Sequence, residues 1–142
     1  MQVQGVFVHG LCLLLFLIPP WLGSGAAMAV TTLVCALWMA RAKLGKLPDK
    51  LYLQGDNGSE NKNRAMLFFL CWLVWLHVFS CIEFHMLIPG HTHEDTDAWF
   101  SVMSRWLVKQ HIFTLSELLS RCVCAHIVPI MAALDLLACC NL

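Results

Sequence analysis

The sequence predicts an α/β domain, because short apolar runs of strand length alternate with longer runs that have helical spacing. Gly, Pro, Asn and Asp separate these runs, as expected of turns and loops. Of the 142 residues, 59% are hydrophobic and 13% are charged. Strands that are buried on both faces of a parallel sheet are one source of such a composition. We therefore expect one α/β domain in which helices cover the central strands.

The first part of the chain is expected to form a β-hairpin and then a helix. The apolar runs 3–8 and 11–18 are rich in Val, Leu and Phe and short enough to be paired strands. A helix is expected from about residue 26 to residue 44, with Ser24 as its N-cap and Gly45 after its end.

The remaining chain is expected to continue with a strand, a helix, a strand and two more helices. A Thr-x-x-Glu capping box marks the start of the last helix. The predicted elements are a strand over 51–54, a helix over 65–78, a strand over 81–88, a helix from Glu94 and a helix from Thr114 to about Val128.

The hydrophobic composition leaves a second interpretation open, a small secreted or single-span membrane protein. The run 11–18 resembles the apolar region of a signal peptide, but residues 1–10 contain no Lys or Arg. The apolar run 66–82 is at the short limit for crossing a bilayer core about 30 Å thick. Polar motifs on both sides favour a buried helix between two strands, and hence an intracellular protein, over a membrane span.

The eight cysteines are scattered, mostly within apolar runs, and no C-x-x-C pair occurs. Structural zinc sites depend on such spacings, so the sequence gives no indication of a zinc site built from cysteines. We expect buried thiols.

Acidic residues follow two neighbouring predicted strands. Asp56 comes at the end of the strand over 51–54, and Glu94, Asp95 and Asp97 follow the strand over 81–88. The carboxyl ends of parallel strands meet at one edge of a sheet, so these carboxylates can converge on a pair of Mg²⁺ ions. The alternative is that Asp56 is a turn residue and the later acids are charges at a helix N-terminus.

The sequence His91-Thr92-His93 precedes these acids and also has two interpretations. Imidazole is a ligand of transition metals, and a neighbouring carboxylate can complete the set. No further ligand is fixed by the spacing, so a solvated polar loop is the alternative.

Two motifs resemble a known family. The chain reads L-Y-L-Q-G-D-N over 51–57 with E-N-K-N over 60–63, and then G-H-T-H-E-D-T-D-A-W-F-S over 90–101. In order and separation these motifs resemble a transposon-derived family of uncharacterised proteins with an RNase H-like, DDE-type integrase or transposase domain. The resemblance covers residues 1–122 and leaves 123–142 as a helical tail outside it.

The resemblance implies a truncated RNase H-like fold, a mixed sheet with flanking helices, and an ancestral activity of metal-dependent nucleic-acid cleavage and strand transfer. Asp56 matches the second acid of the DDE site, and Glu94, Asp95 or Asp97 supplies the third. The implied cofactor is Mg²⁺ or Mn²⁺ and the implied substrate is DNA. His91 and His93 match the signature without an established role.

The chain departs from this family pattern in one respect that affects activity. The fold implies a first strand bearing the first acid, whereas this chain is expected to begin at the second strand, with no acid before Asp49. We therefore expect a sheet that is open at the missing strand and a fragment that is inactive alone. The formal net charge of zero predicts weak DNA binding. Exposed strand edges predict self-association, and a non-catalytic interaction module is a third interpretation.

Overall fold

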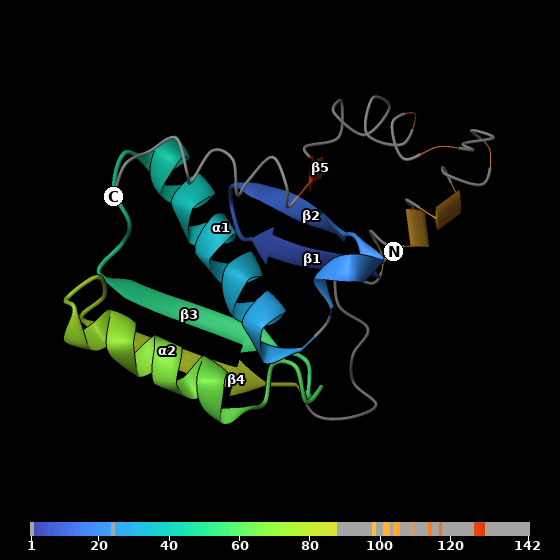
Figure 1. The fold of residues 1–142 in the computed structure, drawn as a ribbon. Helices are drawn as coiled ribbons and strands as arrows, with labels where there is room; N and C mark the ends of the chain where they lie inside the picture. The colour runs from blue at the N-terminus through green and yellow to red at the C-terminus, as the bar shows by residue number, and fades with distance from the viewer. Residues whose placement is uncertain are drawn as a thin grey trace. The chain divides into compact units, whose positions relative to one another are not determined.

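The computed structural model describes residues 2–23 and 25–87 and, beyond them, 98, 101–102, 104–105, 109, 114, 117 and 127–129. The chain divides into two compact units, Met1–Trp21 with His93–Leu142 and Leu22–Thr92 (Figure 1). The described part is mixed α/β, with two small sheets and two α-helices, which confirms the predicted class. Its elements are β1 (Gln2–Val8), β2 (Cys12–Ile18), the 3-10 helix η1 (Pro20–Leu22), α1 (Ala26–Leu44), β3 (Lys50–Gly55), α2 (Arg64–Trp75), β4 (Cys81–Met86) and β5 (Ile127–Pro129).

The predicted N-terminal hairpin is confirmed. Strands β1 and β2 pair antiparallel with Val8 opposite Cys12, and the Leu11 amide donates to the Val8 carbonyl across the turn at 2.9 Å. Gly10 occupies the turn with a φ of 76°, a conformation that glycine adopts without a steric cost. The run that resembles a signal peptide is therefore strand β2, and its residues Leu14 to Ile18 are buried.

The prediction for the C-terminal region is wrong at its end. The capping box is present, since the Thr114 amide donates to Glu117 Oε2 and the Glu117 amide donates to Thr114 Oγ1, each at 3.1 Å. However, Ile127 and Val128, assigned to the last helix, belong to β5, which pairs parallel with β2. Two β-branched residues before a proline suit an edge strand, and periodicity cannot reveal that distant pairing. The helix expected from Glu94 lies largely outside the described residues.

Helix α1 has the predicted bounds. Ser24, the expected cap, lies outside the described residues, and the N-cap is Gly25, without a side-chain hydrogen bond. Gly45 ends the helix with a φ of 79°. By length and composition α1 is the described helix that could cross a membrane, with 33% of its apolar window buried; core helices and signal sequences pass the same test.

Strands β3 and β4 pair parallel, as predicted, with Lys50 opposite Cys81 and Gly55 opposite Met86. Helix α2 connects them and lies over one face of the pair (Figure 1). Both helices contribute to the core on this face. The buried members of the core cluster are Ala29, Leu33, Met66 and Leu70, and Val30, Leu37, Leu53, Phe69, Ile82 and Phe84 pack against them half-buried.

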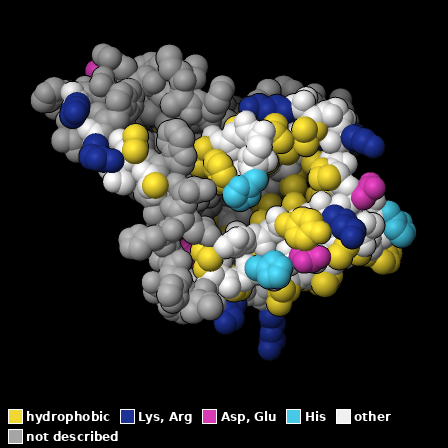
Figure 2. Space-filling model, turned by 180° about the vertical axis from the view of Figure 1, so that it is seen from behind, with side chains coloured by type: hydrophobic (Ala, Val, Ile, Leu, Met, Phe, Trp, Pro, Cys, Tyr) yellow, Lys and Arg dark blue, Asp and Glu magenta, His cyan; other side chains and the backbone are white. Residues whose placement is uncertain are grey.

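The expectation that the central strands are buried on both faces is wrong for this pair. Burial alternates along β3, so that Leu51 and Leu53 are half-buried while Tyr52 is exposed. On β4 the exposed Glu83 and His85 lie 3.6 Å apart, from Oε2 to Nε2. Figure 2, which views the molecule from the side opposite to Figure 1, shows histidine, acidic and basic side chains among hydrophobic ones.

The run 66–82 is not one buried helix. Helix α2 ends at Trp75 in a Schellman motif, in which the His77 amide donates to the Val74 carbonyl and the Val78 amide donates to the Leu73 carbonyl, each at 3.0 Å. Its 12 residues span about 18 Å, too short for a bilayer core of about 30 Å. Moreover, Met66, Leu70 and Leu73 are its buried residues, and its opposite face is exposed.

The expectation of buried thiols holds for Cys35 and is wrong for Cys71. Desolvation by burial raises the pKa of the Cys35 thiol, which keeps it protonated and unreactive. Cys71 is exposed on α2. The described cysteines, which also include Cys12 and Cys81, are free thiols.

Replacing His77 with glycine should stabilise the protein. Among the described residues His77 is the non-glycine residue with a positive φ, 56°, at the position of the Schellman motif that favours glycine. The left-handed conformation costs a residue with a Cβ about 1–2 kcal/mol, and glycine avoids this cost. Glycine also has a greater conformational entropy in the unfolded state, which offsets part of the stabilisation. We expect His77→Gly to raise the free energy of unfolding by about 0.5–1 kcal/mol in urea denaturation. His77→Ala, which keeps a Cβ, should not be stabilising, and equal gains from both variants would contradict this explanation.

Candidate functional site

Two hydrogen bonds and the parallel register hold the carboxyl ends of β3 and β4 together. Gly55 is opposite Met86 in the parallel register, and the Leu87 amide donates to the Gly55 carbonyl at 3.0 Å. Asn57 Nδ2 then donates to the Leu87 carbonyl at 2.9 Å. As a result, the chain leaves β4 next to the loop that begins with Asp56.

Asp56 follows β3 directly and organises this loop. Its Oδ1 accepts one hydrogen bond from the Gly58 amide and one from Asn61 Nδ2, each at 2.9 Å. The first is an Asx-turn bond, which confirms the interpretation of Asp56 as a turn residue. Asp56 is exposed, and no donor among the described residues contacts its Oδ2. One carboxylate oxygen therefore has a structural role, and the other is accessible to a ligand.

The rest of the loop forms a turn and caps α2. The Gly58 carbonyl accepts from the amides of Asn61 and Lys62 at 3.1 and 2.8 Å. Asn63 is the N-cap, and its Oδ1 accepts from the Met66 amide at 2.9 Å while its Nδ2 donates to the Ser59 carbonyl at 3.2 Å. The polar residues 56–63 thus position the start of α2 relative to the end of β3.

The roles of three asparagines were not predicted from the sequence. The N-cap preference for Asn immediately before an apolar helical run would have identified Asn63. Asn61 lies close in sequence to Asp56, but no local sequence pattern indicates that its side chain donates a hydrogen bond to the Asp56 carboxylate. Asn57 contacts Leu87, 30 residues away, and no local pattern predicts such a contact.

Of the predicted site residues, the structure describes Asp56. The others, His91, His93, Glu94, Asp95 and Asp97, lie outside the described residues, so their distance from Asp56 stays a prediction. Within the described part of the chain no group of three or more His, Cys, Asp or Glu residues could hold a metal ion. An exposed carboxylate oxygen fits Mg²⁺ or Mn²⁺ as one ligand of a largely hydrated ion, and a complete site requires further carboxylates.

The comparisons with known proteins give one match. The model of a family described as a domain of unknown function, DUF7869, matches residues 1–138 of this chain, and the chain belongs to that family. No curated protein and no solved structure matches the chain.

Removing the cap of α2 should destabilise the protein. Asn63→Ala leaves the amide of the buried Met66 without its acceptor, and the loss of an N-cap costs about 1 kcal/mol. Asn63→Asp keeps an acceptor and adds a negative charge near the positive end of the helix dipole, so it should retain the stability. Chemical denaturation of both variants measures the difference, and equal losses would show that the cap is not what stabilises the helix.

Two glycines of this region should respond in opposite directions to alanine. A Cβ at Gly58 would lie 2.9 Å from Asp56 Oδ1, so the carboxylate must move away from its two donors. We expect Gly58→Ala to cost about 1 kcal/mol, the net value of a hydrogen bond. A Cβ at Gly55 would meet the Phe84 ring at an ordinary 3.5 Å, and Gly55→Ala should stabilise strand β3 by about 0.5 kcal/mol. Thermal denaturation distinguishes the two, and a loss from Gly55→Ala equal to that from Gly58→Ala would contradict these contacts.

Proposed function

We propose that this DUF7869 domain is built on an RNase H-like, transposase-derived scaffold whose ancestral chemistry was metal-dependent cleavage and strand transfer of DNA. The observation that carries the proposal is the position of Asp56. Its carboxylate follows β3 at the edge where the parallel neighbour β4 ends, and Leu87 bonds to both Gly55 and Asn57 there. In open α/β sheets, ligands bind at this carboxyl edge.

The order of elements supports the same proposal. A hairpin, a helix, a strand, a helix and a second strand parallel to the first follow one another, an order that agrees with an RNase H-like scaffold. The described strands form two sheets that share no strand.

Asp56 would hold one of two divalent ions, with its Oδ2 available as a ligand because Oδ1 is bonded to Gly58 and Asn61. These two bonds fix the direction of the carboxylate, so little side-chain freedom is lost when it binds a cation. Mg²⁺ or Mn²⁺, when bound, supplies stabilisation of the charge that develops on a scissile phosphate. We propose that a further carboxylate completes the site, supplied by Glu94, Asp95 or Asp97. These residues follow Leu87 closely in the sequence.

A non-catalytic interaction module is a second candidate function. It is favoured by the apolar face of α2, where Phe68, Trp72 and Trp75 are exposed to solvent. Large exposed apolar patches mark contact surfaces in soluble proteins.

Mn²⁺ should bind next to Asp56. Its unpaired electrons broaden the NMR signals of nearby nuclei, so titration should selectively broaden the amide signals of Gly58 and Asn61, whose groups bond to Asp56 Oδ1. Asp56→Asn removes the charge and should abolish this broadening at equal Mn²⁺ concentration. Glu83→Gln, which removes an exposed carboxylate on β4, should leave it unchanged. Broadening that persists in Asp56→Asn would remove the metal-binding role from this residue.

The purified chain should neither cleave nor join DNA in the presence of Mg²⁺ or Mn²⁺. Two-metal catalysis needs ligands on both ions, and we propose that this chain supplies two of the three acids of a DDE site. With a formal net charge of zero, the chain should also bind DNA weakly at physiological salt, because few counterions are released. Incubation with supercoiled plasmid and with labelled duplex tests both statements. Cleavage that is lost in Asp56→Ala would contradict the expected inactivity, and would mean that Glu83 or a partner chain replaces the missing acid.

A further inference from the structure

From Leu67 to its C-terminal end, helix α2 presents an apolar face to solvent. Phe68 is 75% exposed, Trp75 is 73% exposed and Trp72 is 46% exposed. Their apolar neighbours on this face are Leu67, Cys71 and Leu76, which are also exposed. We call these six residues the α2 outer face.

This face lies opposite the side of α2 that packs into the core. With 3.6 residues per turn, the positions of the outer face cover the half of the helix circumference that faces away from Met66, Leu70 and Leu73, the buried residues. A helix that is hydrophobic on all sides is ordinarily enclosed by protein. Within the described part of the chain, no element covers the outer face, although its composition is that of a buried surface.

The area of the outer face is sufficient for a specific interface with a copy of itself. Aromatic side chains bury roughly 150–250 Å² each, so the exposed parts of the outer face amount to about 600 Å². Complete burial of both outer faces would remove at most about 1,200 Å² from solvent, which reaches the lower end of the range for specific protein–protein interfaces.

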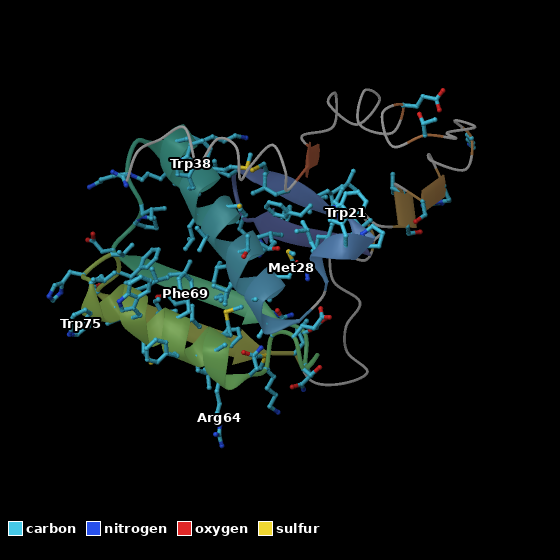
Figure 3. All side chains as sticks on the ribbon, viewed as in Figure 1. Trp21, Met28, Trp38, Arg64, Phe69 and Trp75 are labelled. Atoms are coloured by element: carbon cyan, nitrogen blue, oxygen red, sulfur yellow. The ribbon has the colours of Figure 1, made fainter. Side chains whose placement is uncertain are left out.

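We propose that the chain forms a two-fold symmetric dimer in which the α2 outer faces of two copies pack antiparallel. Arg64 and Trp75 lie at opposite ends of α2 (Figure 3). An antiparallel arrangement brings the Arg64 guanidinium of each copy toward the Trp75 ring of the other, a favourable cation–π pair. A parallel arrangement would instead place the two Arg64 charges side by side at the positive ends of two helix dipoles.

The symmetry also gives Cys71 a definite position. It lies near the middle of the outer face, so the two-fold axis passes close to it and brings the two Cys71 thiols near each other. Cys71 is exposed, whereas the Cys35 thiol is buried and its pKa is raised. Cys71 is thus suited to report the contact by cross-linking.

Analytical ultracentrifugation of the full chain tests the dimer with a matched pair of variants. Trp75 and Trp21 are both 73% exposed, and Trp21 lies on η1, away from the outer face in sequence. The unmodified chain should sediment as a dimer at micromolar concentration. Trp75→Lys, which removes the ring and places a like charge beside Arg64 of the other copy, should raise the dissociation constant at least tenfold, and Trp21→Lys should leave it unchanged. A monomeric unmodified chain, or equal dissociation of both variants, would overturn the proposal.

Oxidation by diamide provides a second measurement that does not depend on a bulky substitution. The unmodified chain should give a covalent dimer on a non-reducing gel, with two thiols oxidised to one disulfide as diamide is reduced. Cys71→Ser should lose this product and Cys81→Ser should keep it. If both variants lose the covalent dimer, or if neither loses it, the proposal is overturned.

A chain that is monomeric and co-sediments with phosphatidylcholine vesicles through the outer face would also overturn the proposal, because that result assigns the face to a lipid surface.

Discussion

The burial of one face of the β3–β4 pair beneath α1 and α2 is the constraint on which the rest of the described Leu22–Thr92 unit depends. Two parallel strands are not stable in water without such cover, since a parallel pair exposes its hydrogen bonds and one apolar face. Met66 and Leu70 provide the cover from α2, and Ala29 and Leu33 provide it from α1. Truncating one buried leucine costs about 2–5 kcal/mol, a large share of the stability of a small domain.

The core also positions the candidate site, because it fixes where β3 and β4 end and where α2 begins. The register that the core fixes places Gly55 beside Met86, and the bonds from Leu87 and Asn57 then set Asp56 next to the chain that leaves β4. At the other end of the loop Asn63 caps α2 and fixes where the helix begins. The same helix has an apolar outer face, so one short element both positions the site and carries the proposed dimer contact.

The elements that could be predicted from the sequence are those whose signals are local. The hairpin, the bounds of α1 and the parallel pairing of β3 and β4 follow from run lengths, flanking glycines and prolines, and a crossover helix. The end of α2 could not be predicted, because His77 takes a conformation usually left to glycine. Strand β5 could not be predicted either, since its pairing with β2 depends on residues far away in sequence. The position of Asp56 at the end of its strand could be predicted, but the roles of Asn57 and Asn61 in the loop that follows could not.

We propose that Asp56 and the acids after Gly90 once held a common pair of metal ions. The most direct test is a crystal structure of the chain grown with Mn²⁺, in which anomalous scattering locates the ions. The account predicts that a carboxylate of Glu94, Asp95 or Asp97 lies within about 10 Å of Asp56, the separation compatible with two ions about 4 Å apart. Acids separated from Asp56 by the β3–β4 pair, with Mn²⁺ bound elsewhere, would contradict it.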